Sequence, residues 1–286
     1  MIIWLASYPK SGNTWVRCFL SSLIYTENGE ANFESLKNIM QYPQRRFFNN
    51  LKGNVDNIYT LSSNWVPSQV KLNSDKKNKI LKTHNIMCSI NKNAFTDNEN
   101  TKGVIYIVRD PRNVVTSIQN HFYKKDANDA LSFILDENKI KGRNLENLDK
   151  NISKDNEIIT LISSWGQHYN SWKNFKKNFL LLKYENLIKD PYKEFSKLRE
   201  YLYNILNLSF SDNKFRQSVE SNTFKNLKSL EIQRGFEEGV SRKNLEKKID
   251  FFNLGEENDF NKILDKKVIE KIELRFNSEM KELNYI

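Results

Sequence analysis

The first residues that could do chemistry form a loop between a short apolar run and a segment with helical spacing. This loop reads Lys10, Ser11, Gly12, Asn13, Thr14 and Trp15. Such a turn directs several backbone N–H groups and a helix N-terminus at one place, and Lys10 adds a positive charge. The loop predicts an anion-binding site, with an ordinary strand-to-helix turn as the alternative. It is not a Walker A loop, because its lysine precedes the glycine.

A second candidate group follows another apolar run. Lys82 and His84 would lie at the carboxyl end of a strand, where parallel sheets place their ligands. Histidine is the usual general base near neutral pH, so His84 is a candidate base, with a structural histidine as the alternative. Of the other two histidines, we interpret His168 as a hydrogen-bonded core residue and His121 as a capping or exposed residue.

A third group follows the run 103–108. Arg109 would lie at the end of that strand, and Ser117 two helical turns later. If the helix runs alongside, the pair could hold a second phosphate. A helix cap formed by Arg109 and Asp110 is the alternative.

Four short, continuous apolar runs must position these groups. Such runs are typical of strands buried on both faces of a parallel sheet, and they cover Ile2–Ala6, Lys79–Thr83, Gly103–Val108 and Phe179–Tyr184. Helical spacing between and after them predicts helices over 14–25, 111–122, 192–206, 213–230 and 266–283, with a further apolar stripe from Ile158 to Phe175. This alternation predicts an α/β fold of three layers, with a central parallel sheet flanked by helices.

Length and composition favour one globular domain over residues 1–286, because no repeat or low-complexity linker interrupts the chain. The net charge of +10 suggests an anionic partner: nucleic acid, an acidic membrane surface or a phosphorylated small molecule. Two cysteines are too few for a disulfide framework or a zinc knuckle, and they fit a cytoplasmic protein. No apolar run reaches the roughly 20 residues that span a bilayer.

Taken together and in this order, the motifs resemble those of the cytosolic, small-molecule sulfotransferases that use 3′-phosphoadenosine 5′-phosphosulfate (PAPS). The similar segments are 9–15, 82–84, 109–117 and 182–187, and the resemblance runs from Ile2 to about Ile272. It implies a P-loop-like fold and transfer of a sulfuryl group from PAPS to a hydroxyl or amine of a small molecule, without metal. The product would be 3′-phosphoadenosine 5′-phosphate (PAP).

The resemblance also implies a role for each matching residue. His84 is similar to the base that takes the acceptor's proton, and Lys10 and Lys82 to the lysines that stabilise the transferring group. The loop from Lys10 through Ser11, Gly12 and Asn13 to Thr14 resembles the one that holds the 5′-phosphosulfate. Arg109 and Ser117 resemble the residues that bind the 3′-phosphate. The residues that resemble those in contact with the adenosine are Trp15, Tyr184, Asn222 and Phe224.

One segment departs from the family pattern of Arg-Lys-Gly followed by Gly-Asp-Trp at the 3′-phosphate. In one register, Arg242 and Lys243 match the two cations of this pattern, but nothing similar follows them. In the other register, Asn253, Leu254 and Gly255 have the expected flanking residues but lack both cations. We favour the second register, because flanking aromatic residues and a downstream helix define a loop better than a dipeptide does.

Two other functions stay open at this point. A nucleotide kinase of related topology is disfavoured by the missing Walker A pattern, and a nucleic-acid binder by aromatic residues that fall in helical stripes. For a sulfotransferase, the sequence leaves the acceptor and the oligomeric state open. The long loops offer Tyr42, Phe47, Phe48, Tyr59, Trp65 and Phe122 as aromatic surface for an acceptor pocket.

Overall fold

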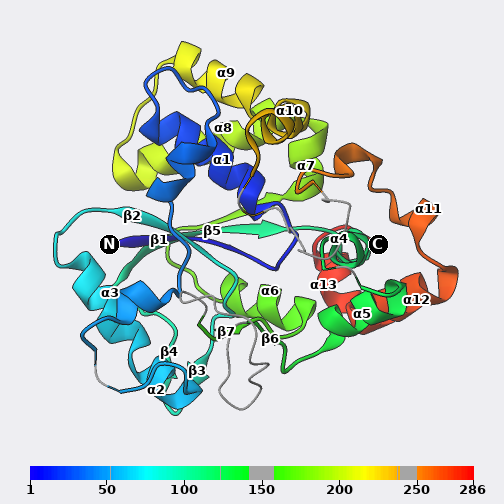
Figure 1. The fold of residues 1–286 in the computed structure, drawn as a ribbon, viewed down its shortest axis with the longest axis horizontal. Coiled ribbons are helices and arrows are strands. Elements are labelled where there is room, and N and C mark those ends of the chain that lie inside the picture. The colour runs from blue at the N-terminus through cyan, green and yellow to red at the C-terminus, as the bar shows by residue number, and fades with distance from the viewer. Residues whose placement is uncertain (52, 123, 142–157, 237, 239–249) are drawn as a thin grey trace. The chain divides into compact units, whose positions relative to one another are not determined.

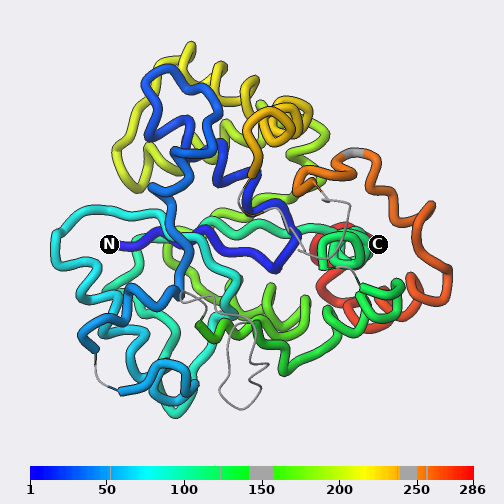
Figure 2. The backbone as a smooth tube through the Cα atoms, in the orientation of Figure 1, coloured from blue at the N-terminus to red at the C-terminus, as the bar shows by residue number. Residues whose placement is uncertain are grey.

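The computed structural model describes residues 1–51, 53–122, 124–141, 158–236, 238 and 250–286 (Figure 1). The backbone, traced in Figure 2, divides into two compact units. The sheet unit comprises Met1–Pro9, Ile39–Ile107 and Leu135–Leu181, and the helical unit comprises Lys10–Asn38, Val108–Ile134 and Leu182–Ile286. One domain over residues 1–286 stays a prediction.

A four-stranded sheet carries the predicted motifs. Its strands are β2 (Lys79–Thr83), β1 (Ile2–Ser7), β5 (Thr101–Val108) and β8 (Phe179–Lys183), in that order. Strand β1 pairs in parallel with β2 and with β5, and all six of its residues are buried. The central parallel sheet of an α/β fold, predicted from continuous apolar runs, is therefore confirmed.

Aromatic side chains fill the core of the sheet unit. The Trp4 ring lies 5.4 Å from Tyr42, 5.3 Å from Phe95 and 6.3 Å from Trp172, measured between ring centroids. Trp65 is also fully buried and meets Phe95 edge-on. The remaining described elements of the unit are η2 (Arg45–Phe48), α2 (Ile58–Ser63), α3 (Trp65–Asn73), α6 (Trp165–Lys173) and the paired strands β3 (Ser89–Ile90) with β4 (Asn93–Ala94) and β6 (Ile140–Lys141) with β7 (Thr160–Leu161).

Most of the apolar stripe from Ile158 to Phe175 is buried as predicted, with Leu161 half-buried, but the stripe is not one helix. Helix α6 begins at Trp165, because the Ser164 side chain caps it by accepting a hydrogen bond from the Gln167 N–H. The residues before the cap include strand β7. One series of apolar positions can therefore run through a short strand and the helix that follows it.

The helical unit contains the helices that follow β1, β5 and β8. These are α1 (Asn13–Tyr25), η1 (Phe33–Asn38), α4 (Pro111–His121), α5 (Ala127–Leu135), α7 (Tyr184–Lys189), α8 (Pro191–Leu206), α9 (Asp212–Ser221), α10 (Phe224–Arg234), η4 (Gly255–Glu257), α11 (Phe260–Ile263), α12 (Lys266–Arg275) and α13 (Asn277–Glu282). Pro111 occupies the first turn of α4, where its missing N–H costs nothing, and Asp110 caps that helix.

Two predicted helices are each divided in the structure. The segment 213–230 forms α9 and α10, because the Thr223 side chain caps a new helix by accepting a hydrogen bond from the Asn226 N–H. The segment 266–283 is divided at Phe276. The first division matters for the site, since it makes Phe224 the first residue of α10.

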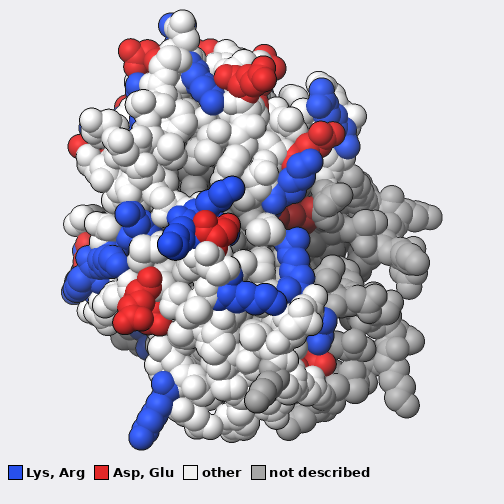
Figure 3. All heavy atoms as spheres, turned by 90° about the vertical axis from the view of Figure 1, so that its left-hand side faces the viewer, with Lys and Arg blue, Asp and Glu red and all other residues white. Residues whose placement is uncertain are grey.

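Charged side chains of both signs lie on the surface. On the face drawn in Figure 3, Lys and Arg side chains are interspersed with Asp and Glu side chains. Exposed ion pairs, such as Lys266 with Glu270, contribute little to stability. Within the described ranges, every helix is too short or too polar to cross a membrane.

Candidate active site

His84 lies in the sheet unit, directly after strand β2. Its Nδ1 is 2.8 Å from the Ser7 carbonyl oxygen. A carbonyl can only accept, so Nδ1 carries the proton and Nε2 is the basic nitrogen of the ring. Burial, reinforced by the Lys82 charge, holds the pKa of His84 well below its usual 6.5. The imidazole is therefore neutral near pH 7 and can accept a proton.

His168 fixes the backbone of this same residue. Its Nε2 donates to the His84 carbonyl oxygen at 3.2 Å, and its Nδ1 lies 2.8 Å from the Tyr106 hydroxyl. The ring is fully buried, and burial lowers its pKa to about 3. The interpretation of His168 as a hydrogen-bonded core residue is confirmed.

Lys82 is a buried cation in the sheet unit, with 5% of its surface exposed. Its backbone N–H donates to Met40 and its carbonyl accepts from Tyr42, which holds this end of β2 in place. The side chain lies close enough to His84 to depress its pKa. A fixed positive charge beside a neutral base suits a reaction in which negative charge develops.

Most of the aromatic residues offered for an acceptor pocket are buried. Tyr42, Phe47, Phe48 and Trp65 are 0–8% exposed. The Tyr42 hydroxyl is 2.7 Å from the Ser68 hydroxyl, which explains how its polar end tolerates burial. Tyr59, by contrast, is 59% exposed.

The remaining predicted site residues lie in the helical unit, beginning with the loop before α1. Lys10 and Gly12 have positive φ angles of 67° and 98°. A Cβ atom on Gly12 would lie 2.6 Å from the Tyr184 ring, so this position requires glycine. Ser11 Oγ is buried and has no hydrogen-bond partner among the described residues. The Thr14 hydroxyl donates to the Glu238 carboxylate at 3.0 Å.

Arg109 joins this loop to Tyr184. Its guanidinium donates to the Lys10 carbonyl oxygen at 3.0 Å and lies 4.1 Å above the Tyr184 ring. Arg109 is 5% exposed, and its Nε atom is buried with no partner in the described part of the chain. Ser117 of α4 is half-buried.

Trp15 and Asn222 are also brought together. The Trp15 ring N–H donates to the Asn222 carbonyl oxygen at 2.6 Å, and the ring meets Tyr184 edge-on at 5.8 Å. The Asn222 amide donates to Ser22 and Ser218. Its buried Oδ1 has no hydrogen-bond partner among the described residues, so it can accept from a ligand.

Phe224 meets the loop predicted to close the site. Gly255 has φ 54°, and a Cβ there would lie 2.4 Å from the Phe224 ring. Asn253 is exposed and Leu254 is half-buried. Downstream, Asn258 accepts from Thr116 and the Phe260 N–H donates to Asn113, which ties this segment to α4. Arg242 and Lys243 lie outside the described residues.

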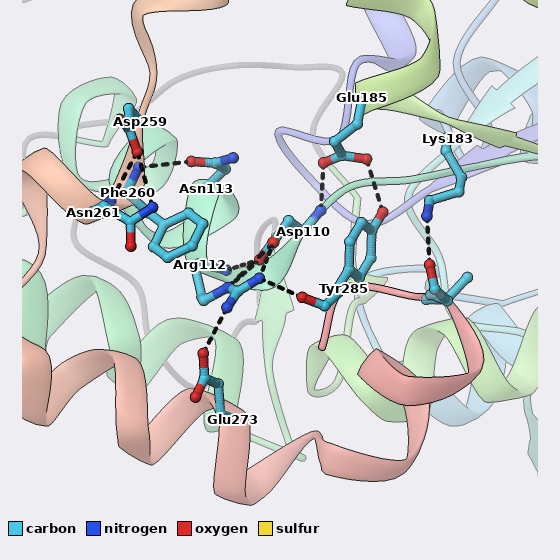
Figure 4. A network of polar contacts seen from close by, with 11 residues as sticks. Asp110, Arg112, Asn113, Lys183, Glu185, Asp259, Phe260, Asn261, Glu273 and Tyr285 are labelled. Atoms are coloured by element: carbon cyan, nitrogen blue, oxygen red, sulfur yellow. Dashed lines mark hydrogen bonds and ion pairs between the residues drawn. The ribbon is translucent and has the colours of Figure 1, made fainter.

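A polar network that the sequence did not suggest holds the ends of β5 and β8 (Figure 4). Glu185 accepts from the Asp110 N–H at 2.8 Å and from the Tyr285 hydroxyl at 2.9 Å. Arg112 bonds both carboxylate oxygens of Asp110, the Glu273 carboxylate and the Tyr285 carbonyl. Burial raises the pKa of Glu185. The network therefore anchors the residues beside Arg109 and Tyr184.

Metal ligands were not predicted, and the described residues contain no group of three or more His, Cys, Asp or Glu side chains placed to hold a metal ion.

The predicted site residues fall into two groups. Lys82 and His84 form one in the sheet unit, and the anion loop, Arg109, Tyr184 and the aromatic contacts form the other in the helical unit.

Comparisons with known proteins cover nearly the whole chain. The model of the sulfotransferase domain family matches residues 2–284. Flavonol 3-sulfotransferase of Flaveria bidentis is 24% identical over an alignment of 287 positions, which covers 95% of this chain and 79% of that protein.

Solved structures share the fold. Mouse sulfotransferase SULT7A1 complexed with PAP has a TM-score of 0.60 at 20% identity, covering 98% of this chain and 84% of its own. Retinol dehydratase in complex with androsterone and PAP has a TM-score of 0.58 at 14% identity, covering 98% and 80%. The P-loop-like α/β fold expected from the motifs is that of these neighbours.

Proposed function

This chain belongs to the sulfotransferase domain family, and from that premise we propose that it moves a sulfuryl group from PAPS to a hydroxyl or amine of a small-molecule acceptor. The observation that carries the proposal is that two buried polar atoms of the helical unit, Ser11 Oγ and Arg109 Nε, have no hydrogen-bond partner among the described residues. Buried hydrogen-bonding groups without partners are costly, and the phosphate oxygens of a nucleotide would satisfy both.

The donor is an adenine nucleotide with anionic groups at two ends, and the helical unit offers contacts for each part. Lys10, Ser11, Gly12, Asn13 and Thr14 are proposed to hold the 5′-phosphosulfate. Trp15, Tyr184, Asn222 and Phe224 are proposed to hold the adenosine. The Asn222 Oδ1, which has no partner among the residues that the structure describes, can accept from the adenine amine. Arg109 and Ser117 are proposed to bind the 3′-phosphate. The PAP bound to the mouse sulfotransferase supports PAPS as the donor.

His84 and the two lysines are proposed to act on the reacting groups. His84 takes the acceptor's proton at Nε2, because Nδ1 is committed to the Ser7 carbonyl. Lys10 and Lys82 stabilise negative charge as the sulfuryl group leaves its phosphate oxygen, much as fixed cations do in phosphoryl transfer. PAPS supplies the sulfuryl group, and PAP is the product.

The reaction is tested directly with labelled PAPS and a panel of phenols, steroids, flavonols, lipid alcohols, sugars and amines. We expect label on at least one hydroxyl or amine, and PAP as the second product. A parallel measurement of melting temperature, with PAP or an RNA oligomer added, separates the sulfotransferase from a nucleic-acid binder. Stabilisation by RNA alone would contradict the proposal.

The pH dependence follows from the depressed pKa of His84. The neutral imidazole is the active form, so kcat/KM should be constant near neutral pH and fall only as the pH passes below 6.5, the usual histidine value. The profile is measured with an acceptor that does not titrate in this range, and circular dichroism at each pH checks the fold. A midpoint at or above 6.5 would contradict the assigned base.

The register of the late loop gives another prediction. We propose that Asn253, Leu254 and Gly255 line the 3′-phosphate site, which the contact of Gly255 with Phe224 supports. The double change Arg242→Ala with Lys243→Ala should then leave PAP affinity within about twofold. The matched control removes two exposed lysines of α12, Lys266→Ala with Lys267→Ala. A tenfold loss of PAP affinity confined to the first pair would show that Arg242 and Lys243 bind the 3′-phosphate.

A further inference from the structure

Glu231 of helix α10 is a buried carboxylate that the proposed mechanism does not use. Only 1% of its surface is exposed, and its two oxygens accept the backbone N–H groups of Phe251 at 2.7 Å and Phe252 at 2.8 Å. Burying a carboxylate is costly unless it is hydrogen-bonded, so these two contacts are what make this position tolerable. They tie a loop to a helix that precedes it by about 20 residues.

The two residues that Glu231 holds contact opposite ends of the proposed nucleotide site. The Lys10 ammonium lies 4.4 Å from the centroid of the Phe251 ring, a cation–π contact. The Phe252 ring meets Phe224 edge-on at 5.9 Å. One carboxylate therefore fixes the backbone of both aromatic residues.

Further contacts lock the same loop onto α10. Gly255 lies against the Phe224 ring so closely that no side chain fits there. The Lys228 ammonium donates to the Asn253 carbonyl oxygen at 3.2 Å. Glu231, Lys228 and Phe224 lie at three- and four-residue spacings, so they share one face of α10. The loop 251–255 is therefore packed along that face.

We infer that Glu231 is a positioning residue for nucleotide binding and transfer. It holds loop 251–255 on α10 so that Phe251 meets Lys10 and Gly255 covers Phe224. The inference rests on the proposed function, because Lys10 and Phe224 are proposed to contact the phosphosulfate and the adenine. It adds a residue that contacts neither group and acts through the loop.

The first test is Glu231→Gln, which keeps the shape but places an amide NH2 against one of the two backbone N–H groups. We expect PAP affinity to fall about tenfold, KM for PAPS to rise and kcat to fall. Glu220→Gln, an exposed glutamate of α9, is the matched control and should bind PAP like the wild type. PAP binding within twofold of wild type in a folded Glu231→Gln protein would overturn the inference.

A double-mutant cycle separates positioning from a general loss of stability. Phe251→Leu removes the ring beneath Lys10 and should lower kcat roughly two- to fivefold. If Glu231 acts through Phe251, the double variant should lose less activity than the two single losses multiplied. Strictly multiplicative losses would overturn the inference.

The outcome also distinguishes this inference from the proposed function. If Glu231→Gln does not fold, Glu231→Asp replaces it, since Asp keeps the charge but is one methylene too short for both contacts. A wild-type protein that binds no PAP would overturn the proposed function itself. A wild-type protein that binds PAP, with Glu231→Asp binding equally well, would overturn the role of Glu231 alone.

Discussion

Replacing His84 with alanine is expected to lower kcat by about 10²–10⁴-fold, the usual contribution of a general base, while PAP affinity changes little. The reason is the geometry of the ring. Nδ1 donates to the Ser7 carbonyl at 2.8 Å, which leaves Nε2 to take the acceptor's proton. Turnover is measured with saturating PAPS and the best acceptor, and PAP affinity by calorimetry.

The matched control for this change is His84→Asn. An asparagine amide can still donate to the Ser7 carbonyl, but it has no basic nitrogen. We therefore expect His84→Asn to be as inactive as the alanine variant, although its fold is closer to the wild type. Near wild-type turnover in either variant would show that His84 is a structural residue.

Replacing Arg109 with alanine is expected to weaken PAP binding by about 1.5–3 kcal/mol, or roughly 10- to 150-fold. The Nε atom of the buried guanidinium has no hydrogen-bond partner in the described part of the chain, and a charge-assisted hydrogen bond to the 3′-phosphate would satisfy it. Adenosine 5′-phosphate lacks that phosphate, so its binding should fall much less. Calorimetry with both ligands measures the difference.

Arg109→Lys is the control that keeps the charge. Lysine cannot reproduce the planar guanidinium above Tyr184 or its donation to the Lys10 carbonyl, so we expect only partial recovery of PAP affinity. Equal losses for PAP and adenosine 5′-phosphate in the alanine variant would contradict 3′-phosphate recognition. They would show instead that Arg109 supports the loop at Lys10.

The sequence alone predicted the central sheet and the elements that carry the motifs. Apolar runs identified the four strands, because strands buried inside a parallel sheet are rich in Val, Ile and Leu. The order of the motifs identified the family, which the match over residues 2–284 bears out. Local patterns were sufficient here, since each strand and each motif is encoded within about ten residues.

Helix boundaries were predictable only in part. The divisions at Ser164 and Thr223 depend on side-chain caps, and such residues also occur inside helices and loops. Burial was not predictable from residue type either. Tyr42 and Trp65 are both fully buried, where they contact Trp4 and Phe95 respectively. Aromatic character alone does not distinguish a pocket wall from a core.

The tertiary structure alone decided which distant residues meet. Arg112 pairs with Glu273, 161 residues away, and Glu231 holds the backbone of Phe251. Neither pairing has a local signature, because a carboxylate 20 or 160 residues away is one among many in a chain with 35 acidic residues. Residue types and spacing determined the chemistry this protein can attempt. Packing between distant segments determined which buried groups hold that chemistry in place, because a buried polar group must find its partner wherever the fold brings one within hydrogen-bonding distance.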